Sequence, residues 1–339
     1  MKKSHCGTII LSAAPESDAI LRGLEPASKK LDGVFFEEKI TTMLCLLLAM
    51  ATGLAWTLVA IFFGNAPKET GGLRRFFLVS NTVYLLLSLP GISLSSVDIH
   101  EFFSLAACIV ASSLMECLGF FMLKFAMSSG NPGIAWCLGQ SSMVVPFVGD
   151  LLFLGGRCTP TQAVGVAFLV ATMGILGSVK GEGGKRSSSG TSARHGRFLF
   201  FAGAAFLCIG LAQFLRSIPS PENFSEAALG WRLPMVSAVP LLFWCFMSTK
   251  GGEKYPVKSL LLKGVVYGIF VALGQKLCLL ALDAGAPVGL NPVVFPIAMG
   301  GSVLLYNLYC AIFLKERFTA LAWTGIGTAL VGMVGIMLK

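Results

Sequence analysis

Long apolar stretches alternate with short polar connections along the whole chain. Several of these stretches approach or exceed the roughly 20 apolar residues that cross a bilayer as an α-helix. Ten segments fit this description: 43–64, 73–90, 102–123, 133–154, 160–179, 198–219, 228–247, 264–282, 293–314 and 320–338. Barrel strands would instead alternate apolar and polar residues over about ten positions, and hydrocarbon satisfies no free backbone group. The pattern therefore predicts an all-α integral membrane bundle of ten transmembrane helices.

The composition agrees with this pattern. Hydrophobic residues make up 55% of the 339 residues and charged residues only 13%, with a mean hydropathy of +0.78. Soluble domains carry about 25% charged residues, so an ordinary soluble protein is excluded. The formal net charge of +9 falls largely in the connections between apolar segments. It therefore reflects membrane topology, and we expect no binding to nucleic acid.

Two polar segments divide the chain. Residues 1–42 mix acidic and basic side chains, and their apolar stretch is too short for a signal peptide, so we expect a disordered or interfacial tail. Met43 is an alternative initiator, which would place this tail outside the native protein. Residues 180–197 are rich in Gly, Ser and basic residues, which predicts a flexible linker. Five predicted spans lie in 43–179 and five in 198–339.

The two halves repeat one another. GLAWTLVAI at 53–61 and GLAQFLRSI at 210–218 are 157 residues apart. Further matches follow in order at offsets of 157, 155 and 160: Arg75 with Arg232, Ser80 with Ser237, Gly119 with Gly274, and Asn131-Pro132 with Asn291-Pro292. Because five is odd, the second copy enters the membrane from the opposite side. Inverted repeats enclose a midplane cavity that can open to either side, which is the architecture of a secondary transporter.

With these motifs the chain resembles the drug/metabolite transporter superfamily, in its EamA-like branch of two five-helix repeats. The resemblance rests on Trp56 in GLAW, on Arg75 in LRRFFLV and on LKERFTALAWTGIGTALVGMVGIML at 314–338. It covers residues 43–338. Where the family pattern usually has a glutamate, the first half has Gly156, while the second half has Glu316. The resemblance implies transport of a small organic solute without ATP, often outward.

Charged residues deep inside predicted spans are candidates for function, because each costs about 2.5–3.5 kcal/mol at a helix centre. Glu116, in LMECLG, is a candidate for titrating a coupled proton or binding a solute amine; the alternative is a structural partner that neutralises it. Lys276, in GQKLCLL, could bind an anionic group of the solute or pair with Glu116. Lys124 lies near the end of its span, where we expect its amine to extend to the interface.

Uncharged polar and aromatic residues inside the spans form a second group of candidates. They are Trp56, Gln140, Gln213, Gln275, Tyr306 and Asn307. Amides can orient a solute by hydrogen bonds while aromatic faces cover its apolar part. The alternative use of these polar groups is hydrogen bonding between helices that holds the bundle together. The sequence leaves both uses open.

Other polar residues have simpler interpretations. Arg75 and Arg232 begin the second and seventh spans, where we expect them to anchor the helices at the interface. The ten cysteines show no CxxC spacing, and the three histidines fall outside the predicted spans. We therefore expect no metal and no cofactor. We also find no clustered carboxylates or nucleophile–base arrangement, so we expect no catalytic residue.

The basic residues leave the orientation open. The odd-numbered connections hold fourteen Lys and Arg, while the even-numbered ones hold Arg157, with Arg216 and Arg232 at span borders. The positive-inside rule then places both termini outside. The family resemblance implies cytoplasmic termini, and the six Lys and Arg of residues 1–42 agree with it. We favour cytoplasmic termini.

These observations predict a secondary active transporter that moves a small organic metabolite across the inner membrane by alternating access. We expect an exporter, with proton coupling through Glu116 as an added hypothesis. The alternatives are a sugar-type importer of the same superfamily, a membrane-embedded enzyme and a non-transporting membrane partner. The expected partners are the lipid bilayer, a small-molecule solute and protons. The sequence leaves open whether the protein is a monomer or a homodimer.

Overall fold

The computed structural model describes residues 16–67, 70–92, 97–129, 132–153, 159–177, 191–219, 223–247, 257–315 and 318–337. Within these ranges every regular element is an α-helix or a short 3-10 helix, and no β-strand is present. Seven helical segments of this part of the chain are long and apolar enough to cross a membrane. The prediction of an all-α, multi-pass membrane protein is therefore confirmed.

The first half of the chain forms six α-helices and two 3-10 helices. They are α1 (Glu16–Gly64), α2 (Thr70–Ser88), η1 (Leu89–Gly91), α3 (Ile99–Ser129), α4 (Pro132–Gln140), η2 (Ser141–Met143), α5 (Val144–Phe153) and α6 (Pro160–Gly177). Each apolar segment predicted in this half coincides with one helix or with consecutive helices. The segment 133–154 falls on α4, η2 and α5, so its helix is interrupted near the middle.

The second half has a similar order of helices. It forms α7 (Thr191–Ser217), α8 (Glu226–Leu229), α9 (Arg232–Phe246), α10 (Val257–Gly285), η3 (Ala286–Val288), α11 (Asn291–Ile312) and α12 (Ala320–Met337). The seven membrane-length segments are Lys39–Gly64, Ile99–Ser129, Pro132–Phe153, His195–Ser217, Glu226–Phe246, Leu260–Val288 and Val293–Ile312. Pro160–Thr172 and Ala320–Gly335 are shorter apolar helices.

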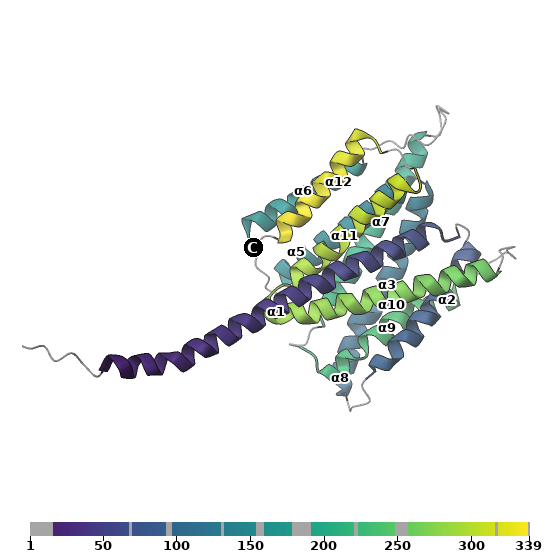
Figure 1. The fold of residues 1–339 in the computed structure, drawn as a ribbon. Helices are drawn as coiled ribbons and strands as arrows, with labels where there is room; N and C mark the ends of the chain where they lie inside the picture. Colours follow the sequence, from purple (N-terminus) through teal and green to yellow (C-terminus); the bar gives the residue numbers. More distant parts are fainter. Residues whose placement is uncertain are drawn as a thin grey trace, which may run out of the picture.

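The polar segments differ in part from the sequence-based expectation. Helix α1 begins at Glu16, inside the expected tail, and its N-terminal part projects away from the bundle (Figure 1). Residues 1–15 lie outside the described residues. The expected linker, 180–197, is described only from Thr191 onward, where α7 has already begun. Residues 180–190 lie outside the described part of the chain.

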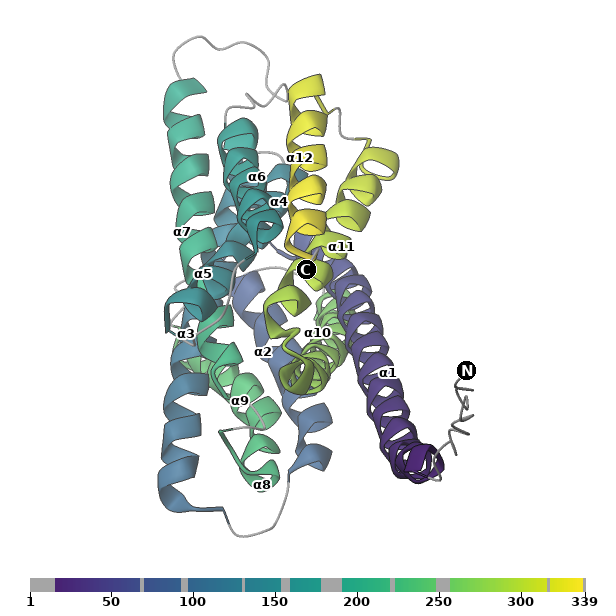
Figure 2. The ribbon, with the colours of Figure 1, turned by 90° about the vertical axis from the view of Figure 1, so that its left-hand side faces the viewer.

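The helices pack into one bundle in which elements from the two halves interleave. Helix α3 packs on α7, and α10 packs on α1 and α2. Helices α6 and α12 lie side by side at one edge, away from α2 and α10 (Figures 1 and 2). The largest cluster of buried apolar side chains includes residues of both halves, among them Phe63, Trp136, Trp244 and Tyr306.

Glycines allow the closest helix crossings. A Cβ atom at Gly119 of α3 would lie 2.6 Å from Cγ1 of Ile209 on α7. A Cβ atom at Gly274 of α10 would lie 2.8 Å from Cδ1 of Trp56 on α1. Small residues let the backbones of membrane helices approach closely, where van der Waals packing holds them together. Both crossings lie beside the cavity described next, because Trp56 and Ile209 line it.

Candidate functional site

A cavity of about 80 Å³ lies between α1, α2, α3, α4, α7, α9, α10 and α11. A single water needs roughly 10–15 Å³ of such space, so the cavity has room for several waters or a small solute. Its walls are mainly apolar and aromatic, with a few polar groups. Helices α6 and α12 contribute no residue to the lining among the described residues.

The centre of the polar wall is an ion pair between Glu116 of α3 and Arg216 of α7. Arg216 Nη2 donates to Glu116 Oε2 at 2.6 Å, and Arg216 Nη1 donates to Glu116 Oε1 at 3.2 Å. The carboxylate and the guanidinium thus form a bidentate contact, which is stronger than a pair joined by a single hydrogen bond. Only 4% of the Arg216 side chain and 18% of the Glu116 side chain are exposed.

Gln275 of α10 joins this pair to a third helix. Its Oε1 accepts a hydrogen bond from Arg216 Nη1 at 2.9 Å, and its Nε2 donates to Glu116 Oε1 at 3.3 Å. The amide therefore presents its acceptor to the cation and its donor to the anion. Three helices, α3, α7 and α10, are linked by one network of charge-assisted hydrogen bonds at the cavity wall.

The close approach of α3 and α7 explains how Glu116 reaches Arg216. Gly119 lies one helical turn from Glu116, and Ile209, which packs against Gly119, lies two turns from Arg216. A larger residue at position 119 would separate the two backbones. The ion pair thus depends on a small residue close to it in the sequence.

Among the residues that line this cavity, four side-chain atoms are buried and have no hydrogen-bond partner in the described part of the chain. They are Tyr84 Oη, Gln140 Oε1, Gln213 Oε1 and Arg216 Nε. Each of these residues is at least nine-tenths buried. Buried polar groups are normally hydrogen-bonded, so unpartnered ones at a cavity wall are candidates for contact with a ligand.

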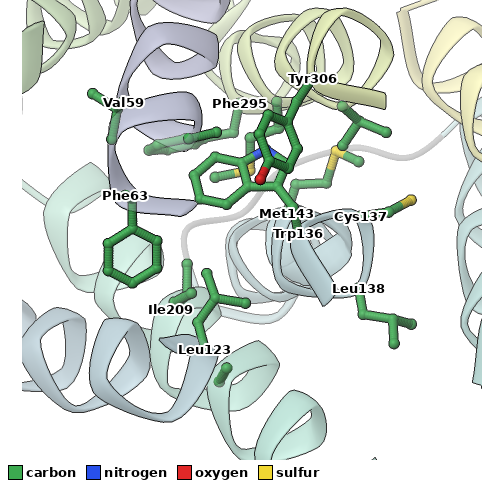
Figure 3. Close-up of a cluster of buried hydrophobic side chains, with 14 of the residues drawn as sticks. Val59, Phe63, Leu123, Trp136, Cys137, Leu138, Met143, Ile209, Phe295 and Tyr306 are labelled. Carbon is green, nitrogen blue, oxygen red and sulfur yellow. The ribbon is translucent and has the colours of Figure 1, made fainter. Parts of the chain in front are cut away.

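Aromatic side chains form the rest of the wall. Phe77 and Trp244 are stacked, with ring centroids 4.6 Å apart and planes 14° from parallel. Trp136 of α4 lies against Tyr306 of α11, with centroids 5.6 Å apart, and donates from Nε1 to Ser302 Oγ at 3.1 Å (Figure 3). This contact joins the two helices at the side of the cavity and fixes the face that Trp136 presents.

The interruption of the helix after α4 lies at the cavity. Gln140, a lining residue, is the last residue of α4, and η2 follows at once. A short 3-10 stretch inside a longer helix often marks a functional hinge or a strained segment. Discontinuous helices near the bilayer midplane are typical of solute sites in transporters.

Five of the eight candidates from the sequence line the cavity: Trp56, Glu116, Gln140, Gln213 and Gln275. Tyr306 lies behind Trp136, and Asn307 donates from Nδ2 to Val303 O within its own helix. Lys276 is exposed, outside the cavity. Successive residues of an α-helix point about 100° apart, so when Gln275 faces the cavity its neighbour points away. Glu116 pairs with Arg216, and the suggested pair with Lys276 is not formed.

Sequence reasoning missed Arg216 and Tyr84. Arg216 had been assigned to a span border, although it lies three residues after Gln213 and therefore on the same face of α7. This spacing is the signal that could have identified it. Tyr84 lies within the apolar run of α2, and nothing in its sequence context distinguishes it from a packing residue.

Two of the other basic residues discussed above, Lys124 and Arg232, are buried in the bundle. Lys124 Nζ donates to Phe63 O at 2.8 Å and to Ala66 O at 2.9 Å, at the C-terminal end of α1, where cations are favourable. Its amine is therefore buried in protein and does not extend freely to the interface. Arg232 is likewise buried and pairs with Asp283 of α10, whereas Arg75 is exposed as an interfacial anchor would be.

Comparison with known proteins adds support for the fold. No protein-family model matches the chain, and no curated protein matches it. One solved structure, described only as "Crystal structure of protein", is similar with a TM-score of 0.50 and 14% sequence identity. The match covers 86% of this chain and 94% of that one. The likeness is one of fold alone.

Proposed function

We propose that the protein is a secondary transporter of the drug/metabolite transporter superfamily, built as two inverted five-helix repeats in the inner membrane. It exports a small organic metabolite by alternating access. The observation that carries the proposal is the cavity itself. It lies inside a multi-pass membrane protein, draws its walls from both halves of the chain, and holds a buried ion pair beside polar atoms without a partner in the described chain.

The packing of the helices supports the inverted repeat. Under the repeat, α1 corresponds to α7, α2 to α9, α3 to α10, α4–α5 to α11, and α6 to α12. Helix α3 packs on α7 as α10 packs on α1, and α1 packs on α11 as α7 packs on α4 and α5. Helices α2 and α9 pack on each other, as do α6 and α12. If each helix is replaced by its counterpart in the other half, the same helix–helix contacts result. A twofold axis that relates the two halves would produce this pattern.

Glycines at matching positions support the same proposal. Gly119 and Gly274, 155 residues apart, lie at the α3–α7 and α10–α1 crossings. Gly53 and Gly210 are 157 residues apart; a Cβ atom at Gly53 would lie 2.6 Å from Ala298 O, and one at Gly210 would lie 2.9 Å from Ser142 O. Within each pair, the two glycines allow close approach at equivalent helix crossings. Two copies of one structural unit are expected to show this pattern.

The ion pair gives a means to couple solute and proton. Both oxygens of Glu116 accept hydrogen bonds from Arg216, so a proton on this carboxyl group would displace at least one of these contacts. Loss of the contact would free part of the guanidinium toward the cavity. Proton binding at Glu116 and solute binding beside Arg216 would then be linked, as coupled transport requires.

The test has two stages. An overexpressing strain is grown on a panel of toxic metabolites, where an exporter confers resistance and an importer sensitises. The solutes that change growth are then measured for flux in proteoliposomes under an imposed pH gradient. We expect the pH gradient to drive solute flux in the unaltered protein. In Glu116→Gln we expect flux that no longer depends on the gradient. Absence of flux for all of them contradicts the transport function, and unchanged coupling in Glu116→Gln ends the proton role.

A further inference from the structure

The charges at the cavity wall cancel each other. Of the described residues that line the cavity, Glu116 and Arg216 are the charged ones, and each neutralises the other in a bidentate pair. Other basic groups nearby are used elsewhere: Lys124 contacts the end of α1, and Lys276 is exposed outside the cavity. A solute with a net charge would therefore enter a low-dielectric site without a free counter-charge, which is unfavourable.

The unpartnered atoms of the lining residues determine which hydrogen bonds a solute can form with these side chains. Gln140 Oε1 and Gln213 Oε1 are acceptors, Arg216 Nε is a donor, and Tyr84 Oη can act as either. Contacts to these atoms leave the bond between Glu116 and Arg216 intact. They call for a solute that carries both donors and acceptors in neutral groups.

The shape of the site adds a third constraint. Phe77 and Trp244 form a stacked pair at the wall, and Trp56, Phe120 and Tyr267 extend the aromatic lining. Flat rings gain contact with aromatic faces in stacked or edge-to-face arrangements. A cavity of about 80 Å³ is too small for a solute of nucleotide size.

Resting on the proposed transport function, we propose that the cavity selects small, flat ring solutes without net charge that carry both hydrogen-bond donors and acceptors. Glu116 and Arg216 set this selectivity while Glu116 is ionised, because the intact pair rejects solutes of either net charge. Each of them alone favours a solute of the opposite charge. Gln140 and Gln213 accept the donors of the ring.

The experiment compares three probes that share one ring and differ in charge: uracil, its anionic 6-carboxylate (orotate), and cationic 5-aminomethyluracil. Binding to the purified full chain in nanodiscs is measured by tryptophan fluorescence, since Trp56, Trp136 and Trp244 line the cavity. Uracil is expected to bind at least tenfold more tightly than either charged analogue. Equal or tighter binding of a charged analogue overturns the inference, as does the absence of uracil binding.

Variants test the assigned roles. Glu116→Gln leaves Arg216 unpaired and is expected to shift the preference at least tenfold toward orotate, whereas Arg216→Gln shifts it toward 5-aminomethyluracil. Gln213→Leu keeps the ion pair and weakens uracil binding at least tenfold, so the inference is testable even where a charge variant fails to fold. Lys276→Gln, outside the cavity, is the matched control. An unchanged charge preference in a folded charge variant, or unchanged uracil binding in Gln213→Leu, contradicts the assignment.

Counterflow of labelled uracil in proteoliposomes separates this inference from the proposed function. Selective binding without counterflow contradicts transport and leaves the selectivity of the site supported. Counterflow that proceeds equally well with orotate supports transport and overturns the selectivity.

Discussion

The α3–α7 crossing and the α10–α1 crossing are built alike and filled differently. Each has a glycine at the closest approach, Gly119 in one and Gly274 in the other, and each lies beside the cavity. At the sequence offsets of 155 and 157, Glu116 corresponds to Val271 and Arg216 corresponds to Val59. All four of these residues line the cavity: Glu116, Arg216, Val271 and Val59. One crossing carries an ion pair where the other carries two valines.

This difference shows that the ion pair is not needed to pack a crossing of this type. Valines occupy the corresponding positions of the α10–α1 crossing, so a crossing of this type packs without charged residues. Replacing a buried ion pair by well-packed apolar residues is often neutral or stabilising, and each charge inside a membrane is expensive. The α3–α7 crossing therefore gains little stability from its charges, which agrees with a role for them in the proposed solute site.

The largest effect is expected when one charge of the pair is removed. Arg216→Val leaves Glu116 buried without its cation, and we expect the free energy of unfolding to fall by about 3–5 kcal/mol. Unfolding by steric trapping in bicelles would measure this change. Arg75→Val, at an exposed position, is the control and should change little. A loss below about 1 kcal/mol for Arg216→Val would show that Glu116 is satisfied without Arg216.

The two glycines give the next largest effect and test whether the crossings are equally tight. Alanine at either position overpacks the crossing, which typically costs about 1–3 kcal/mol. Gly119→Ala should cost more, because its Cβ would also lie 3.1 Å from the backbone N of Ile209. At Gly274 the close neighbours are side-chain atoms of Trp56, which can shift.

Thermal unfolding of both variants in one detergent would rank them. Solute binding should show the opposite order. Gly274→Ala should weaken it more than Gly119→Ala does, because Trp56 lines the cavity and must move to accommodate the added methyl group. If Gly274→Ala proved less stable than Gly119→Ala, the contact with the backbone of Ile209 would not be what limits the packing at these crossings.

Much of the fold could be predicted from the sequence because long apolar segments have few alternatives in a bilayer. Their lengths indicate helices, and the helices observed coincide with them. Pro146 predicts an interruption of this segment, because proline donates no backbone hydrogen bond and its ring clashes with the carbonyl four residues earlier. That carbonyl belongs to Ser142, which lies within the 3-10 stretch Ser141–Met143.

The site could be predicted only in part, because burial in a span does not say which way a side chain points. Gln275 and Lys276 are neighbours in the sequence, yet the first lines the cavity and the second is exposed. Helix rotation decides between them, and rotation is set by packing between segments far apart in the chain. Grouping polar residues by helical spacing, as for Gln213 and Arg216, recovers part of this information.

Replacing both charges is expected to have a small effect on stability. Glu116→Val with Arg216→Val reproduces the residues found at positions 271 and 59 of the other crossing. The free energy of unfolding should stay within about 1 kcal/mol of the unaltered protein, since no unpaired charge remains. Proton-coupled flux in proteoliposomes should nevertheless be lost. A loss of stability as large as that of Arg216→Val alone would contradict the separation of packing from function.

The smallest effect is expected at Lys276, which can be compared with its neighbour Gln275 on α10. This residue follows Gln275 directly but is exposed, and the network around Glu116 uses the amide of Gln275 alone. Lys276→Gln leaves this network intact and should therefore leave counterflow unchanged. Gln275→Leu, one residue away, should impair counterflow because it removes contacts to both charges. If Lys276→Gln impairs flux as strongly, α10 presents a different face to the cavity during transport.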